Sequence, residues 1–177
     1  MFESINSSNG IAGDGTTGFG NTHFLASTDA ASGLYALGAY TRTNIDEAKE
    51  ILGANSNFNG QITRIVPRES NTFYGAVSNS GQSVGNTDSR GWFFASRTGA
   101  SASYLQKNAT QTTATPGAAG VPSVKMYISA RNSSGTTDRF ATNQIACAGI
   151  WTALSTAEGS SLYTIILDYM TTLGRNV

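Results

Sequence analysis

Residues 90–108, RGWFFASRTGASASYLQKN, decide the fold class of this chain of 177 residues. Two sets of side chains alternate along the first half of the stretch: Trp92, Phe94 and Ser96 on one face, and Phe93, Ala95 and Arg97 on the other. We expect the reversal within 98–101, where Gly99 can adopt the positive φ that a tight turn needs. The stretch therefore predicts a β-hairpin.

The residues before this hairpin predict three more strands. Residues 33–42, GLYALGAYTR, are apolar on both faces and suit a central strand. Residues 60–68 and 71–78 are two further candidates, and we expect Pro67 and Asn71 at strand ends because proline cannot donate to a ladder.

Two earlier segments give weaker signals. Residues 43–54 are ambiguous, because Asn44 and Glu47 have the spacing of a helix cap while EILGA could equally begin a strand. The first thirty residues contain the hairpin-type dipeptides Asn-Gly at 9–10 and Asp-Gly at 14–15, so we expect short strands and tight turns there.

The residues after the hairpin continue the β pattern. Residues 122–132 alternate between two faces: Val124, Met126, Ile128 and Ala130 against Lys125, Tyr127, Ser129 and Arg131. This pattern predicts a strand with one buried face and one wet face. Residues 143–151, NQIACAGIW, predict the last strand.

The closing residues 154–177, LSTAEGSSLYTIILDYMTTLGRNV, carry a long helical pattern. Ser155 and Glu158 have the spacing of a capping box, Gly174 stands where a left-handed C-cap residue belongs, and Arg175 places positive charge at the negative end of the helix dipole. The apolar residues recur at helical steps: Leu162, Ile165, Ile166, Tyr169, Met170 and Leu173. We expect one helix over about 155–173.

An isolated helix of this length and composition would be marginally stable in water. Its apolar stripe must therefore be buried, either against the outer face of one sheet as a structural lid or against a neighbouring subunit.

Uncharged polar residues dominate the composition. Ser, Thr, Asn and Gly make up 77 of the 177 residues, whereas charged residues are 12% and the 11 basic and 11 acidic residues cancel. Such surfaces are typical of exposed β-sandwich proteins, and the absence of a basic block argues against binding to nucleic acid. No run of about 18 apolar residues occurs, so we expect no membrane insertion.

The C-terminal third resembles the end of laminin-G-like, concanavalin A-like modules found in bacteriophage tail and head proteins and in some bacterial surface proteins. The pattern is carried by Ile145, Ala148, Gly149, Ile150, Trp151, Leu154, Ser155, Glu158, Leu162, Tyr163, Ile166, Tyr169, Leu173, Gly174 and Arg175. MYISARNSSGT, GWFFASRT and GDGTTGFGNT are similar to two preceding strands and the opening segment of these modules.

This resemblance implies an all-β fold: a two-sheet antiparallel jelly-roll sandwich with one C-terminal helix. Without a composition shift or a linker, we expect a single laminin-G-like domain over 1–177. The resemblance implies little about chemistry, because sandwiches carry lectins, glycosidases and plain structural parts alike.

The chain offers no catalytic pair of carboxylates. Two acids on one face of a strand would be spaced two residues apart, and this spacing does not occur in a strand of the chain. The acidic cluster Asp46, Glu47 and Glu50 accompanies Lys49, and we interpret it as a solvated face. We therefore expect no enzymatic activity and no catalytic residue.

Single histidine and cysteine residues make metal or nucleophilic sites improbable. His23 precedes Phe24 and Leu25, which favours a packed or hydrogen-bonded structural histidine. Cys147 lies in an apolar run, which favours a buried hydrophobe. No cofactor or metal is expected; calcium remains an alternative, with Asp14 or Asp88 as ligands.

Glycan binding needs an exposed aromatic face and a few polar partners. Phe58, Tyr74 and Trp92 are the candidates for such contacts, although Trp92 also suits a core position.

We therefore expect a non-enzymatic module on a virion surface, such as a capsid decoration, head-fibre or tail-fibre subunit. Its partners would be other virion or surface protein chains, and we expect a homo-oligomer. The alternative is an extracellular module of a phage or bacterial surface protein that binds glycans.

Overall fold

The computed structural model describes residues 4–6, 9–57, 61–79, 81–117 and 120–177. Their elements are β1 (Ser4–Asn6), β2 (Gly10–Ala12), β3 (Gly20–Leu25), α1 (Ala26–Asp29), β4 (Tyr35–Thr41), β5 (Leu52–Asn57), β6 (Gln61–Glu69), β7 (Thr72–Asn79), β8 (Gln82–Gly85), β9 (Gly91–Gly99), β10 (Ala102–Lys107), β11 (Thr110–Ala114), β12 (Lys125–Ile128), β13 (Arg131–Ser133), β14 (Thr136–Asp138), β15 (Gln144–Thr152) and α2 (Thr156–Thr172).

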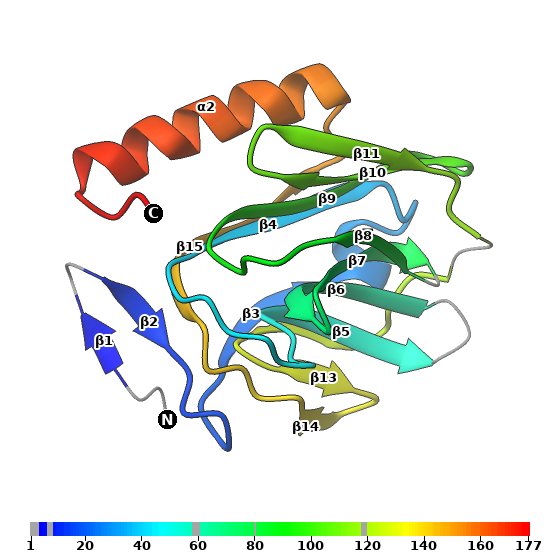
Figure 1. Ribbon diagram of the computed structural model, residues 1–177. Coiled ribbons are helices and arrows are strands. Elements are labelled where there is room, and N and C mark those ends of the chain that lie inside the picture. The colour runs from blue at the N-terminus through cyan, green and yellow to red at the C-terminus, as the bar shows by residue number, and fades with distance from the viewer. Residues whose placement is uncertain (1–3, 7–8, 58–60, 80, 118–119) are drawn as a thin grey trace.

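The described strands form a sandwich of two sheets that α2 covers on one side (Figure 1). The seven-stranded sheet has the order β1-β2-β15-β4-β9-β10-β11. The eight-stranded sheet has the order β14-β13-β5-β6-β7-β8, with β12 paired to β5 and β3 paired to β12. Pairing is antiparallel except between β13 and β5. The predicted all-β sandwich with a C-terminal helix is confirmed.

Because side chains alternate along the first strand of the predicted hairpin, its two faces pack into two different hydrophobic cores. Phe93 and Ala95 of β9 pack between the two sheets, and Trp92 and Phe94 pack on the opposite face of the same sheet, beneath α2. All seven residues of β4 are buried, as expected for a central strand with a core on each face.

Two local expectations were wrong, and one ambiguity is resolved. Gly99 does not have a positive φ, because β9 continues through it and the reversal lies at 100–101. Pro67 lies inside β6, at a register irregularity between Val66 and Glu69 where the pairing with β7 is already interrupted. Residues 43–49 form no helix, and the ambiguous segment enters β5 at Leu52.

The predicted strand 122–132 is two short strands, β12 and β13. Ser129 separates them with a φ of 62°, a conformation that ends a β ladder. Because the chain turns here, Ser129 and Arg131 are buried rather than on the expected wet face, whereas Lys125 is exposed as predicted.

The helix α2 has the predicted ends. Ser155 and Glu158 form the complete capping box. At the other end Gly174 has a φ of 65°, and the Arg175 and Gly174 amides donate to the carbonyls of Met170 and Thr171, which is the Schellman arrangement.

Only part of the predicted apolar stripe is buried. Met170 is fully buried, and Leu162 and Ile166 pack partly against the sheet. Ile165 and Tyr169 are 64% and 53% exposed, because they lie on the outward side of the helix. Of the two alternatives for burying the stripe, the outer face of the sheet therefore covers only part of it, and burial against a neighbouring subunit stays a prediction.

Candidate functional site

The outer face of the eight-stranded sheet carries three arginines around one buried carboxylate. Leu52 and Ala54 of β5 and Ile65 of β6 point into the core between the sheets. Since side chains alternate along a strand, Gly53 and Arg64, which pair across β5 and β6, face outward. We call Glu50, Arg64, Arg131 and Arg139 the arginine cluster.

Glu50 lies at the centre of this cluster and is fully buried. Its Oε1 atom is 3.5 Å from Arg131 Nη1 and 3.8 Å from both Arg64 Nη1 and Arg139 Nη1. Neither carboxylate oxygen accepts a hydrogen bond. Gly53 makes room for this packing, because a Cβ atom there would lie 3.0 Å from both Arg131 Cα and Glu50 Cβ.

The cluster carries more positive than negative charge. Arg131 is held by Asp138, with Nε–Oδ1 at 2.8 Å and Nη2–Oδ2 at 2.6 Å. Three guanidinium groups thus face two close carboxylates, Glu50 and Asp138, and Glu69 acts on Arg64 from beyond ion-pair distance. The side chains of Arg139 and Arg64 are 33% and 18% exposed, so part of this charge reaches the surface.

Burial controls the protonation of the central carboxyl group. Desolvation raises the pKa of Glu50 to about 7, against the opposing pull of Arg139, Arg131 and Arg64. Desolvation likewise lowers the pKa of the Arg64 guanidinium. When Glu50 takes up a proton, the excess of positive charge in the cluster increases by one.

Aromatic side chains flank the cluster. The Arg64 guanidinium lies over the Tyr74 ring, 5.5 Å from its centroid. Tyr127 is the strand partner of Gly53, and its ring centroid is 4.6 Å from that of Phe19. Phe19 is 37% exposed and offers an apolar ring face to solvent.

The three glycan-contact candidates have different positions. Tyr74 is half-buried on β7 beside the arginine cluster. Trp92 is completely buried between the seven-stranded sheet and α2, which is the core position that the sequence also allowed, so it is no longer a candidate for a glycan contact. Phe58 lies outside the described residues.

The predicted solvated acidic cluster is three separate sites. Asp46 accepts from the Ser70 amide, and Glu47 accepts from the amide and hydroxyl of Thr142. Glu50 is buried among arginines. The three residues are close in sequence but form separate sites, because each carboxylate contacts a different segment that is distant in the chain.

The other singled-out residues serve local structure. His23 is exposed with a φ of 62°, so it is not a packed core histidine. Asp14 accepts three backbone amides of its own turn, and Asp88 binds Arg90. Cys147 is half-buried, and desolvation raises the pKa of its thiol to about 11. The described residues contain no group of three potential metal ligands of the His, Cys, Asp or Glu type.

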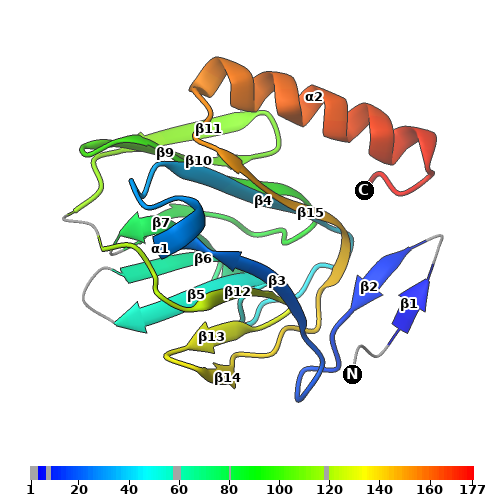
Figure 2. The ribbon, with the colours of Figure 1, turned by 180° about the vertical axis from the view of Figure 1, so that it is seen from behind.

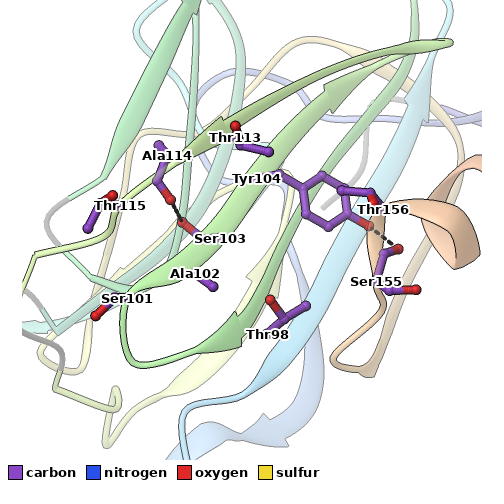
Figure 3. Close-up of a pocket in the computed structure, with 10 residues that line it drawn as sticks. All are labelled: Thr98, Ser101, Ala102, Ser103, Tyr104, Thr113, Ala114, Thr115, Ser155 and Thr156. Atoms are coloured by element: carbon purple, nitrogen blue, oxygen red, sulfur yellow. Dashed lines mark hydrogen bonds between the residues drawn. The ribbon is translucent and has the colours of Figure 1, made fainter.

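A hollow of about 490 Å³ lies where β9, β10 and β11 meet the start of α2 (Figure 3). Hydroxyl groups of Thr98, Thr113 and Thr156 line it, and the Tyr104 hydroxyl donates to the Ser155 carbonyl at 2.9 Å. Its lining is uncharged, and Tyr104 is only 2% exposed, so the hollow offers neither a cation nor a stacking face.

Sequence reasoning missed the arginine cluster. One usable signal was Arg64, a charged residue inside the otherwise β-type run QITRIV. Arg131 was assigned to a wet face without a partner. The convergence of residues 50, 64, 131 and 139 depends on strand order, which the sequence does not display.

Neither protein-family models nor curated proteins match the sequence. Solved structures match its fold. The NanB sialidase of Streptococcus pneumoniae is 13% identical with a TM-score of 0.56, over 81% of this chain and 27% of the sialidase chain. The chain thus spans about a quarter of that protein.

A smaller solved protein matches over nearly its full length. The CBM40 module of the Ruminococcus gnavus IT-sialidase, bound to α2,3 sialyllactose, is 12% identical with a TM-score of 0.56, over 81% of this chain and 92% of the module. A leech intramolecular trans-sialidase complexed with 2,7-anhydro-Neu5Ac is 9% identical with a TM-score of 0.50, over 80% of this chain and 26% of that chain. At these identities the matches show the fold.

Proposed function

We propose that this protein is a non-catalytic glycan-binding module that holds an acidic sugar at the arginine cluster. The observation that carries the proposal is the convergence of three guanidinium groups on one buried carboxylate that makes no hydrogen bond. Paired arginine donors suit a carboxylate ligand, because guanidinium and carboxylate groups form charge-assisted hydrogen bonds.

The surroundings of the cluster also suit a sugar. The ring of Phe19, which is 37% exposed, supplies an apolar surface against which a pyranose ring can stack, and Tyr74 supports the Arg64 guanidinium that lies over its ring. The CBM40 module of similar fold was solved with sialyllactose, a glycan that carries a carboxylate on its sialic acid residue. A sialylated glycan is therefore the ligand we assign to this site.

The position of the acidic groups supports a binding role rather than catalysis. Glu50 has a pKa raised to about 7, as a general acid would, but its side chain is fully buried behind the arginines. Asp138 is engaged by Arg131. Glu50 is therefore not placed to transfer a proton to a bound sugar, and Asp138 serves as the ion-pair partner of Arg131.

A surface or secreted location would follow from such a ligand. Neither described helix has the length and hydropathy needed to cross a bilayer. None of the three solved structures named above is a virion protein, so the virion role expected from the sequence stays a prediction.

Calorimetric titration with 3′-sialyllactose tests the proposal, with lactose as the uncharged control ligand. We expect sialyllactose to bind and lactose not to bind. Arg139→Gln should weaken binding at least tenfold, because it removes the most exposed guanidinium of the cluster. Arg90→Gln is the matched control, since Arg90 is an exposed arginine away from the cluster.

Thermal unfolding of each variant verifies that it is folded. Absence of binding at millimolar sialyllactose, equal binding of lactose, or an unchanged affinity in Arg139→Gln would overturn the proposal.

A further inference from the structure

One margin of the seven-stranded sheet has an open backbone edge. β15 pairs with β4 from Ile145 to Thr152, but with β2 only at Gln144 and Ile145. The ladder to β2 stops at Gly10, whose φ of 94° turns the chain away. Within the described part of the chain, residues 146–152 therefore have a strand on one side only, as Figure 2 shows along the margin next to β2.

Three hollows follow this edge in sequence order. The first, of about 200 Å³, lies beside the end of β2 and is lined by Gly10, Ile11, Ile128 and residues 145–148. The second, of about 210 Å³, shares Ile128 and Ala148 with the first and reaches Ile150. The third, of about 380 Å³, begins at Ile150 and ends at Thr152. Together they form a groove along about 24 Å of strand, since seven residues each rise about 3.4 Å.

The groove suits apolar side chains. The opposite sheet contributes Leu52 and Ile128 to its floor, and Phe24 and Leu34 line the far end. Asp29 is the one charged residue that lines any of the three hollows. The edge itself carries Ala146, Ala148 and Gly149 and none of the lysines or prolines that usually protect an exposed edge.

We propose that β15 residues 146–152 bind an extended segment of another polypeptide as an added antiparallel β-strand. The unpaired edge supplies backbone hydrogen bonds, and the hollows accept the alternate side chains of the guest. A guest that continues the direction of β2 would begin near Thr152, so a basic residue at its N-terminal end would face Asp29.

A second copy of this chain would fill the same groove only in part. If two β15 edges paired, Ile150 and Trp151 would be the only large apolar side chains among the seven residues that each copy offers. Ala146, Ala148 and Gly149 are too small to fill hollows of about 200 Å³ or more. Larger apolar residues at alternate positions are what the groove requires.

The test uses the whole protein and a nine-residue peptide, lysine followed by four threonine-leucine pairs, labelled for fluorescence anisotropy. Amide hydrogen exchange gives the second readout. Without peptide, alternate amides within 146–152 should exchange faster than those of β4, which is paired on both sides. Saturating peptide should protect them.

Ala148→Lys should weaken peptide binding at least tenfold, because it places a charged side chain on the exposed edge. Ala157→Lys, at an exposed alanine of α2, is the matched control and should bind as the native protein does. A peptide with proline in place of every threonine should not bind, because proline lacks the N–H group.

Three results would overturn the proposal. These are no binding of the threonine-leucine peptide, equal binding to Ala148→Lys, and protection of 146–152 by self-association in the absence of peptide.

Discussion

At the scale of single residues, Glu50 is the one acidic residue among the described residues whose side chain is buried. It is fully buried and both of its oxygens lack hydrogen bonds, so only the arginines at 3.5–3.8 Å compensate its ionised form. A carboxyl group in this position links the stability of the fold to pH.

We predict that the protein loses stability as pH rises through neutrality. The folded-state pKa of Glu50, about 7, lies above the ordinary value of 4.5, so the folded state holds the proton more tightly than the unfolded state. The contribution of this proton to the free energy of unfolding is complete below pH 4.5 and is lost by about pH 7. Relative to Glu50→Gln, the native protein should lose up to about 3 kcal/mol of unfolding free energy over this range.

Urea unfolding of both proteins at a series of pH values measures this difference. Other titrating groups are shared and cancel in the comparison. A difference that stays constant from pH 4.5 to 7 would contradict the assignment of Glu50.

Gly159 sets the distance between α2 and the sheet. A Cβ atom at this position would lie 2.2 Å from the Tyr104 hydroxyl oxygen. We predict that Gly159→Ala destabilises the protein by about 1–3 kcal/mol in chemical unfolding, although alanine is the better helix former. The control Ser161→Ala, at an exposed position of the same helix, should change stability by less than about 0.5 kcal/mol.

At the scale of elements, α2 carries two ridges of apolar side chains: one ridge is buried against the sheet and the other faces outward. Met170 is fully buried with Leu162 and Ile166 beside it, whereas Ile165 and Tyr169 face outward. A helix with apolar residues over more than half of its circumference cannot bury all of them on one flat sheet.

Alanine substitutions in the buried ridge and in the outward ridge should differ in their effect on stability. Met170→Ala should cost about 2–5 kcal/mol, because it leaves a cavity between the helix and the sheet. Ile165→Ala should change stability by less than about 0.5 kcal/mol. Equal losses in urea unfolding would show that the outward ridge is also covered in solution.

The same ridge bears on the homo-oligomer expected from the sequence, which stays a prediction. Ile165, Tyr169 and Leu173 are 64%, 53% and 40% exposed along one side of α2. Light scattering of the purified protein measures the state directly, and a monomeric mass at high protein concentration would contradict the expectation.

At the scale of the whole molecule, the protein has no net charge that could attract a charged ligand over a long distance. The net charge is zero, so an acidic glycan would not be attracted to the protein as a whole. Any attraction must come from the arginine cluster, where Arg64 and Arg139 are partly exposed.

We therefore predict that sialyllactose binding is sensitive to salt. Affinity should fall severalfold between about 0.05 and 0.5 M sodium chloride, because a partly exposed guanidinium–carboxylate pair is screened. Titrations in sodium chloride and in an equal osmolarity of sucrose separate screening from crowding. An affinity independent of salt would place the ligand on uncharged groups, such as the hydroxyl-lined hollow beside Tyr104.

The sequence by itself determined the features that depend on neighbours within a few residues. Alternation in 90–108 predicted β9 and β10, and the spacing of Ser155, Glu158 and Gly174 predicted both ends of α2. These signals are local because strand faces repeat every two residues and a helix cap is made within one turn.

Only the tertiary structure decided which residues make up the arginine cluster, the surface proposed to bind a glycan. Glu50 and Arg64 come together through the pairing of β5 with β6, and Arg131 through the pairing of β13 with β5. The open edge of β15 likewise exists because β2 turns away at Gly10. Strand order brings together residues far apart in the chain, so the burial and charge of each group depend on partners that its own segment does not specify.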